Sequence, residues 1–264
     1  MYMTPVRLLD DLLISQGRYV VTTDDIEGAI GRSPNSSGRL AGLRRQHRLV
    51  SAAKGLYLVI PAEYRNWGSL PADWFIDALM RHLDRKYYVG LLSAAAIHGA
   101  SHQAPQVFQV MVDERVRARS LGRVKLRFYR SGVLKDTIER QGVERRPTHT
   151  GEYNLSSPEL TAIDLVEYQR DAGGLNNIAT VLSELEGLHG DVLSRLAEGR
   201  PQSVIRRLGW LLDRYGHADQ LDGVAALVVP DREHPTPLEP DGSSTGPFHP
   251  RWNLLENAEI EPDL

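Results

Sequence analysis

Guanidinium, amide and hydroxyl groups are concentrated between residues 31 and 54, where the sequence has no Asp or Glu. The six cations of this segment are Arg32, Arg39, Arg44, Arg45, Arg48 and Lys54. Such cations neutralise DNA phosphates, which supply most of the affinity in protein–DNA contacts. Arginine can also bond guanine bidentately, and asparagine can bond adenine in the same way. The segment therefore predicts DNA binding through the N-terminal quarter of the chain.

A helix that begins near Ser33 would sort these groups onto defined faces. Ser33 is a suitable N-cap and Pro34 a suitable first helical residue. With Leu40 and Leu43 on the buried side, helical geometry leaves polar and small residues on the opposite face. The residues of that face, which we expect to read base edges, are Asn35, Gly38, Arg39, Gly42 and Arg45. The residues that we expect to contact phosphates are Ser33, Ser36, Ser37 and Arg44.

The elements around this helix follow the order of a winged helix-turn-helix. Periodicity and capping signals define them. The expected helices and strands of this region span residues 5–16, 19–21, 24–30, 49–52 and 56–60. Lys54 and Gly55 form the turn between the last two strands, which places Lys54 at the tip of the wing, near the DNA backbone or the minor groove. The alternative interpretation is a solvated basic helix on a small domain.

A second basic segment without acids runs from Arg115 to Arg130. Its cations alternate with apolar residues, so in extended chain they share one side. The cations of the two expected strands are Arg115, Arg117, Arg119, Arg123, Lys125 and Arg127. A hairpin of this kind has one basic and one apolar face. The basic face is a solvated surface, an additional DNA contact, or a site for RNA or an acidic partner, and the sequence leaves these interpretations open.

Residues 61–71 have the composition of a linker or an extended surface crossing. We therefore expect two domains, a winged helix-turn-helix at 1–61 and a larger domain at 62–264. The expected helices of the second domain span 73–86, 91–98, 157–168, 175–186, 191–197 and 201–215. Its expected strands span 107–113 and 124–130, and Tyr153 and Leu155 extend their sheet.

The predicted fold class is α+β, with an N-terminal winged helix-turn-helix followed by a larger mixed α/β domain. In that domain we expect a small antiparallel sheet packed with helices. The acidic tail that starts at Asp231 has an apolar part at 252–260, which we expect to dock on the sheet.

The composition limits the classes of protein to consider. A net charge of −3 over 264 residues does not by itself indicate nucleic-acid binding, so that case depends on the local segments. The absence of cysteine excludes disulfides, thiolate metal sites and thiol catalysis. Asp10 and Asp11 interrupt the apolar pattern of the N-terminus, unlike a signal peptide, and no run of about 18 apolar residues occurs. We expect a cytoplasmic location.

Motifs for catalysis and cofactor binding are absent from the sequence: it has no G-x-G-x-x-G, no Walker A and no G-x-S-x-G. His98 and His102 have the spacing of zinc ligands, but a glycine between them ends the helix. Asp113 and Glu114 at a strand end, with Lys125 on the next strand, resemble part of a nuclease site, yet Arg123 stands where a further acid is required. We therefore expect no catalytic residue, no metal and no cofactor.

Six segments resemble, in their order along the chain, the AbiEi family. They are KGLYLVIP, YVGLLSAAAIHG, VFQVMV, RVKLRFYR, SSPELTAIDLVEY and IRRLGWLLDRYG. The order of the segments, rather than any single one, carries the resemblance, which extends from about Pro5 to Asp263. Members of this family are the antitoxins and autorepressors of bacterial AbiE-type, or type IV, toxin–antitoxin systems.

The resemblance implies a winged helix that binds inverted repeats in the operon's own promoter and represses it. It also implies a C-terminal domain that counters a nucleotidyltransferase-type toxin, with direct toxin contact left open. The family's basic residue, glycine and aromatic of the wing match Lys54, Gly55 and Tyr57, which adds Tyr57 to the expected DNA-binding residues. Where family members often end the recognition helix with glycine, this chain has His47, which either adopts a left-handed conformation or lets the helix continue.

Two other functions stay open at this point. One is a transcription regulator with a ligand-sensing C-terminal domain and no toxin partner, and the other is a DNA- or RNA-processing enzyme. Because no heptad or dimer seam is recognisable, we expect a monomer in solution that pairs on its operator DNA, and no membrane partner.

Overall fold

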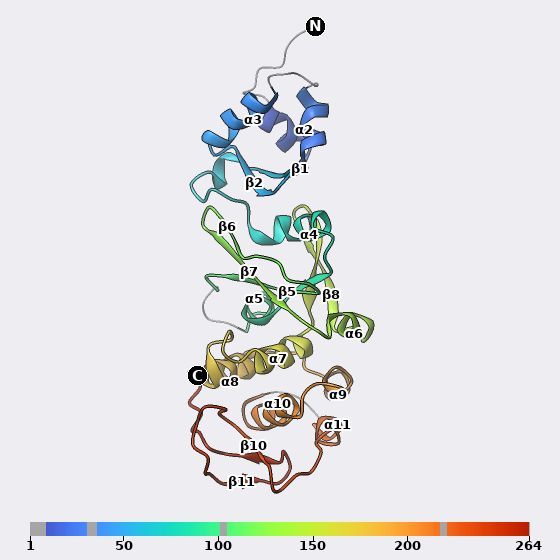
Figure 1. Ribbon diagram of the computed structural model, residues 1–264, viewed down its shortest axis with the longest axis vertical. Coiled ribbons are helices and arrows are strands. Elements are labelled where there is room, and N and C mark those ends of the chain that lie inside the picture. Colours follow the sequence, from blue (N-terminus) through green and yellow to red (C-terminus); the bar gives the residue numbers. More distant parts are fainter. Residues whose placement is uncertain (1–8, 31–35, 101–104, 217–220, 264) are drawn as a thin grey trace. The chain divides into compact units, whose positions relative to one another are not determined.

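A computed structural model describes residues 9–30, 36–100, 105–216 and 221–263, and of Ile30, Ser36, Ser37 and Arg39 it describes the backbone alone. The chain forms two compact units. Unit 1 comprises residues 1–87, 106–131 and 145–154, and unit 2 comprises residues 88–105, 132–144 and 155–264. Figure 1 shows the succession of elements along the chain.

The N-terminal part of unit 1 has three helices and a small antiparallel sheet. Its elements are α1 (Leu9–Ser15), β1 (Val20–Thr22), α2 (Thr23–Ile30), α3 (Ser36–Arg45), β2 (Leu49–Ala53) and β3 (Leu56–Val59). The three strands lie in the order β1-β3-β2, and Ala53 pairs with Leu56 around the expected turn. The element order and the turn at Lys54 and Gly55 therefore agree with the pattern in the sequence.

Apolar spacing and local caps explain why these residues fold this way. Helix α3 contributes the buried Leu43 to a core with residues of α1, β1, α2, β2 and β3. Helix α2 begins where the Asp25 carboxylate accepts bonds from the Thr22 backbone N–H and hydroxyl, both at 2.7 Å, and the Thr22 backbone N–H bond chiefly lowers the Asp25 pKa. Helix α3 ends at Arg45, His47 after it has a φ of 54°, and the Arg48 N–H bonds the Leu43 carbonyl at 3.0 Å. The left-handed alternative expected for His47 is thus confirmed.

The other elements of unit 1 follow the N-terminal part in the sequence and pack closely. They include a 3-10 helix (Ala62–Tyr64), α4 (Ala72–His82), β5 (Phe108–Val112), β6 (Arg119–Leu121) and β7 (Val124–Arg130). The expected linker at 61–71 is wrong, because Ser69 and Leu70 are fully buried. The Arg123 N–H bonds the Trp67 carbonyl at 2.8 Å, which fixes this segment against the β6–β7 turn.

A six-stranded sheet has the strand order β6-β7-β5-β4-β9-β8. The three strands not yet introduced are β4 (Tyr87–Val89), β8 (Val143–Thr148) and β9 (Gly151–Ser156). The expectation of a small antiparallel sheet is corrected, because β5 and β7 pair in parallel from Phe108↔Leu126 to Val112↔Arg130. The alternating pattern identified both strands correctly, but it carries no information on direction, which depends on how residues 113–123 cross between them.

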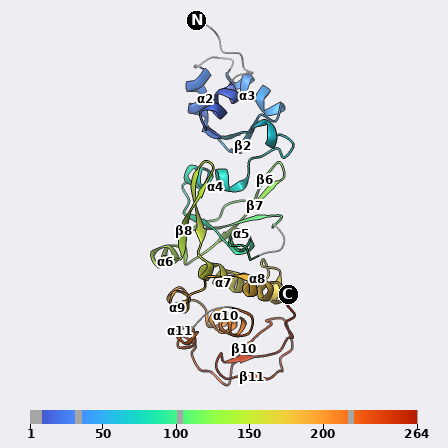
Figure 2. The same ribbon diagram turned by 180° about the vertical axis from the view of Figure 1, so that it is seen from behind.

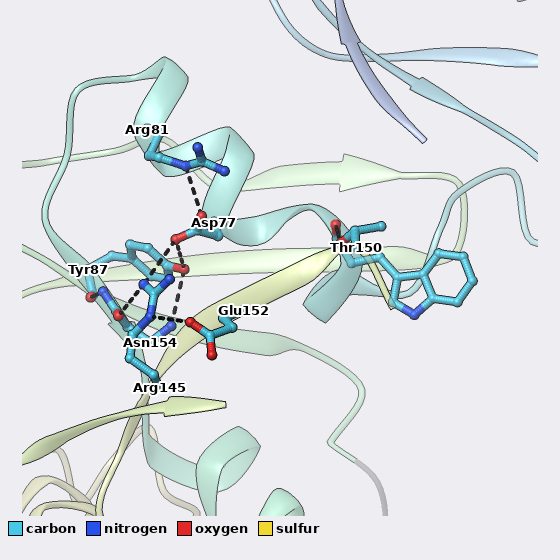
Figure 3. A network of polar contacts seen from close by, with 8 residues as sticks. Asp77, Arg81, Tyr87, Arg145, Thr150, Glu152 and Asn154 are labelled. Atoms are coloured by element: carbon cyan, nitrogen blue, oxygen red, sulfur yellow. Dashed lines mark hydrogen bonds and ion pairs between the residues drawn. The ribbon is translucent and has the colours of Figure 1, made fainter. Parts of the chain in front are cut away.

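Polar bonds join the β8–β9 hairpin to α4 within unit 1 (Figure 3). Asp77 of α4 accepts from the Tyr87 hydroxyl at 2.9 Å and pairs with Arg81 at 2.8 Å. Arg145 of β8 lies 3.8 Å from Asp77, 3.3 Å from Glu152 and 3.0 Å from the Asn154 side-chain oxygen. The Arg145 guanidinium is therefore bonded to side chains of unit 1, and its charge is neutralised there.

Unit 2 is mainly helical. Its elements are α5 (Leu91–Ile97), α6 (Leu134–Glu139), α7 (Pro158–Glu167), α8 (Gly174–Glu184), α9 (Gly190–Ala197), α10 (Gln202–Tyr215), α11 (Asp222–Ala225), β10 (Thr236–Pro237), β11 (Phe248–His249) and β12 (Leu254–Leu255). Helix α7 is the most buried: Ser157 caps it by accepting from the Leu160 N–H, and Pro158 is its first residue. The mixed α/β class predicted from the sequence is confirmed. No described helix combines the length and apolar character that crossing a membrane requires.

The apolar tail docks on a helix and not on the sheet, which corrects the expectation for 252–260. Trp252 is fully buried, and its Nε1–H donates to Asp213 of α10 at 3.1 Å. The indole lies directly on Gly209 of α10, where a Cβ would come within 2.1 Å of the ring. Helix α10 thus needs glycine at this position to accept the tail.

The substitution Gly209→Ala is therefore expected to destabilise the protein by about 1–3 kcal/mol, because the new methyl group must displace the indole. Urea unfolding followed by tryptophan fluorescence measures this change. Gly28→Ala in α2 is the matched control, since a Cβ there meets nothing within 4 Å. The control should be neutral or slightly stabilising, and a Gly209→Ala protein as stable as the control would contradict the packing.

A buried polar cluster joins α7 to Tyr88 and Arg200, all within unit 2. The Asp164 carboxylate is fully buried and accepts from the Tyr88 hydroxyl at 2.8 Å. Arg200 lies 3.6 Å from Asp164 but closer to Glu167, which it also bonds. Burial raises the pKa of Asp164 to about 7, because the loss of solvent around the carboxylate outweighs the opposing effects of Arg200 and the Tyr88 hydroxyl.

The stability of the protein should consequently fall as pH rises from about 5 to 7. Folded Asp164 holds a proton that the unfolded chain releases near pH 4, so this contribution is complete below pH 4 and is lost through the folded pKa of about 7. The slope is at most about 1.4 kcal/mol per pH unit. Asp164→Asn should remove it, as measured by urea unfolding at several pH values. If wild type and Asp164→Asn differed in unfolding free energy by the same amount at every pH between about 5 and 7, the assignment of this pH dependence to Asp164 would be contradicted.

Candidate nucleic-acid interface

Helix α3 is held by its apolar side and exposes its basic side. Leu43 is 2% exposed and Leu40 packs partly against the same core. Arg44 and Arg45, in the last turn, are exposed. Neither forms an ion pair with an acidic residue of the described chain. The helix therefore presents two unneutralised guanidinium groups on a fixed support.

Several predicted site residues cannot be placed by their side chains. Ser33 and Asn35 lie outside the described residues. For Ser36, Ser37 and Arg39 the structure gives the backbone, which belongs to α3. These five residues keep the roles that the sequence predicts for them as hypotheses.

Arg48 pairs with acidic side chains, unlike the described side chains of Arg44, Arg45 and Lys54. It bonds Asp10, whose carboxylate is 2% exposed, and lies 3.6 Å from Asp11. Arg65 also approaches Asp10 at 3.6 Å. This pairing could not be predicted from local sequence patterns, because Asp10 and Arg48 are 38 residues apart. Arg48 therefore contributes to α1 packing and not to the exposed basic surface.

The β2–β3 turn is anchored at its backbone. His82 of α4 donates from Nε2 to the Lys54 carbonyl at 2.9 Å, and the Thr23 N–H donates to the Gly55 carbonyl at 3.1 Å. The Lys54 side chain is exposed, whereas Tyr57 is half-buried and packs against the core of α1, α2 and α3. Lys54 is thus available for a ligand, and most of the Tyr57 ring is occupied by packing.

A groove of about 510 Å³ lies beside the basic side of α3. Its lining residues are Ala41, Arg44, Arg45, Leu49, Val50, Ser51, Ser120, Leu121 and Gly122. Helix α3 and strand β2 form one wall, and the end of β6 forms the other. The sequence analysis did not predict that residues 41–51 and 120–122, which are about seventy residues apart, line the same groove.

The second basic segment, residues 115–130, contributes Ser120, Leu121 and Gly122 to the lining of this groove. Arg119 donates from Nη1 to the Ala52 carbonyl of β2 at 2.8 Å, and burial lowers the pKa of its guanidinium. On β7, Lys125 and Arg127 are exposed while Leu126 between them is 1% exposed, as the alternation predicts. Arg123 is exposed in the β6–β7 turn. The described hairpin is shorter than expected: β6 begins at Arg119, so Arg115 and Arg117 precede the strand.

The residues considered for metal or enzyme chemistry have structural partners. His98 donates from Nε2 to the Ser156 carbonyl at 2.8 Å, and His102 lies outside the described residues. Asp113 accepts from the Lys86 N–H at 3.2 Å, and Glu114 pairs with Arg85 at 3.0 Å. Among the described residues no three His, Asp or Glu side chains are grouped to hold a metal ion.

The AbiEi antitoxin C-terminal domain family matches residues 88–214. Residues 88–214 thus form an AbiEi antitoxin C-terminal domain. The family resemblance read from the six segments is thereby confirmed, and this AbiEi protein is an antitoxin of a toxin–antitoxin system with a toxin partner. Residues 88–214 include the β6–β7 hairpin, α7 and α10.

Solved structures place the AbiEi chain in a known fold. The RV2827C protein from Mycobacterium tuberculosis superimposes with a TM-score of 0.66 at 20% identity, over 96% of this chain and 92% of that chain. A nucleotidyltransferase-like antigenic protein from Paracoccidioides brasiliensis gives a TM-score of 0.28 at 12% identity, over 55% and 92% of the two chains, and supports no conclusion. No curated protein matches the sequence.

Proposed function

We propose that this antitoxin also represses its own operon, by binding inverted repeats in the promoter through α3. The observation that carries the proposal is the support of α3 by Leu43 and the exposure of Arg44 and Arg45 beside a groove. The order of helices and strands around α3, with the sheet order β1-β3-β2, is that of winged helix-turn-helix proteins. In such proteins the equivalent helix enters the major groove.

The predicted roles divide the α3 residues into two sets. The sequence predicts that Arg45 shares the face opposite Leu43 with Asn35 and Arg39, where bidentate bonds to guanine or adenine would give sequence preference. Arg44 and the serines of the helix start would bond phosphates, which fixes the register but carries no sequence information. Lys54 would contact the DNA backbone beside α3. A monomer on each half of the inverted repeat accounts for binding without a dimer seam.

We further propose that the C-terminal part neutralises a nucleotidyltransferase-type toxin. This proposal is supported by the family match over 88–214 and by the family's association with such toxins. Promoter and toxin are both cytoplasmic partners. Three modes of neutralisation stay open: direct contact with the toxin, modification of the toxin, and protection of the toxin's substrate. Catalysis by the antitoxin has no support from the described side chains.

A separation-of-function experiment tests both halves of the proposal. The full chain and its Arg44→Ala/Arg45→Ala variant are expressed beside a reporter under the operon's own upstream region, and then beside the neighbouring toxin gene. Wild type should repress the reporter and protect cells, whereas the variant should lose repression and keep protection. Repression by the variant at the wild-type level would contradict the role of α3, and toxicity despite wild-type antitoxin would contradict the second half.

The full chain is preferable to a fragment that starts at residue 62. Tyr19 contacts Trp74 and His149 through edge-to-face rings at 5.2 Å and 5.1 Å, and Arg119 bonds the Ala52 carbonyl. Cutting near residue 61 would break these contacts inside unit 1. The domain boundary predicted at 61 stays a prediction, and point variants avoid depending on it.

A further inference from the structure

We propose that the β6–β7 hairpin is a second DNA-binding arm, which contacts duplex phosphates next to the segment read by α3. The arm consists of the β6–β7 turn and the exposed cations Arg117, Arg123, Lys125 and Arg127. The inference rests on the proposed DNA binding and extends it to a part of the chain outside the winged-helix elements. Figures 1 and 2 show β6 and β7 below the sheet that contains β2.

The first step is the limited reach of the β2–β3 hairpin. Its turn has two residues, and both of their carbonyls are bonded, to His82 of α4 and to Thr23 of α2. A wing usually supplies the backbone or minor-groove contact beside the recognition helix. Here the anchored turn offers a single cation, Lys54. We therefore expect further phosphate contacts with the flanking duplex to come from another part of the chain.

The second step is the fixed position of the β6–β7 hairpin. Arg119 bonds the Ala52 carbonyl at the free edge of β2. At the other end of β6, Gly122 has a φ of +55° and packs so closely that a Cβ would lie 2.1 Å from the Trp67 carbonyl oxygen. Two anchors on opposite ends of a three-residue strand hold the hairpin beside the N-terminal elements.

The third step is the continuity of the two basic surfaces. Arg44 and Arg45 line one wall of the 510 Å³ groove, and Ser120 and Gly122 line the other. Arg123 follows Gly122 directly, and Lys125 pairs with Ser120 across the hairpin. A phosphate backbone that passes the end of α3 would therefore meet the cations of the hairpin next.

The fourth step is the availability of these charges. Arg117, Arg123 and Lys125 are exposed and pair with no acidic side chain in the described parts of the chain. Arg145 gives the contrast within the same unit, because Asp77 and Glu152 neutralise it (Figure 3). Unpaired cations gathered on one hairpin of a chain of net charge −3 are suited to a polyanionic partner.

Duplex DNA fits this surface better than single-stranded nucleic acid. Single strands are bound through aromatic side chains on which bases stack. The aromatic ring next to these cations, Tyr129, is 8% exposed and lies under the Arg127 guanidinium at 5.2 Å from its centroid. Exposed cations whose neighbouring ring on β7 is closed are suited to phosphates, which position a protein on the duplex.

Fluorescence anisotropy of the full chain on its own upstream duplex and on a scrambled duplex, over a salt series, tests the inference. Arg123→Gln/Lys125→Gln should weaken binding to both duplexes about equally and lower the slope of log K against log salt by about 1.8, or about 0.9 for each lost phosphate contact. Lys135→Gln/Arg170→Gln is the matched control with the same change of charge; both its side chains are exposed, at 73% and 86%. Its affinity and slope should stay at wild-type values, and thermal melting confirms that both variants fold.

The possible outcomes distinguish failure of the DNA-binding arm from failure of the proposed promoter binding through α3. If wild type prefers its own duplex and the Arg123→Gln/Lys125→Gln variant keeps the wild-type slope, the arm is refuted and α3 binding stands. If that variant binds DNA normally but fails to protect against the toxin, the hairpin is a partner surface and the arm is again refuted. If wild type shows no preference between the duplexes, the promoter-binding proposal fails together with the arm.

Discussion

Arg45→Ala is expected to reduce specific promoter binding by about 1–3 kcal/mol, the discrimination that one bidentate arginine–base pair supplies. Arg45 is exposed in the last turn of α3, opposite the buried Leu43. The loss should fall on the operon's own duplex and spare a scrambled one, so the ratio of the two affinities drops. Anisotropy titrations on both duplexes measure that ratio.

Arg44→Ala provides the contrasting variant one residue away. Because Arg44 is expected to contact a phosphate, its loss should weaken both duplexes alike and lower the salt slope by about 0.9. Arg170→Ala, an exposed arginine 86% accessible in unit 2, is the inert control. If Arg45→Ala lowered both affinities equally, Arg45 would be a phosphate contact and the base-reading face of α3 would need reassignment.

Arg200→Met is expected to lower the free energy of unfolding by about 3–5 kcal/mol. The Arg200 side chain is 4% exposed and lies between the carboxylates of Asp164 and Glu167. It also bonds the Thr137 hydroxyl at 3.2 Å. Its removal leaves two acids with no cation in a site where one of them is already fully buried. Urea unfolding at pH 7.5 measures the effect.

Asp164 makes the effect of Arg200→Met depend on pH. The Asp164 carboxyl can take up a proton as pH falls, so the variant should recover part of its stability at pH 5. Arg170→Met, which breaks an exposed pair with Asp241, should cost less than about 1 kcal/mol at either pH. A loss for Arg200→Met as small as for this control would show that the cluster does not hold α7 in place.

The N-terminal elements could be predicted because their signals are local. Acidic residues at the start of α2, the leucine spacing of α3 and the Lys54-Gly55 turn each act within one element. The same holds for α7, where Ser157 and Pro158 mark the start, and for α10. The left-handed conformation of His47 was one of two alternatives that the sequence left open, and the structure decides between them.

The features that were missed depend on distant partners. Strands β4 and β8 have no clean alternation, since all three residues of β4 are buried and most of β8 is exposed. Leu70 is buried through packing that a Pro-flanked segment does not reveal. The contact of Arg119 with Ala52 spans 67 residues, so the groove beside α3 could not be anticipated from either basic segment. The contact between Trp252 and Gly209 was missed for the same reason, because it depends on the tertiary fold.

The most direct test of promoter binding is an anisotropy titration of the full-length protein on its own upstream region and on a scrambled duplex of equal length, from low salt to about 150 mM. We expect binding to the upstream region to survive at about 150 mM salt while binding to the scrambled duplex fades, since phosphate contacts alone weaken steeply with salt. Equal binding to both duplexes that disappears together with rising salt would contradict an operator-binding role for α3.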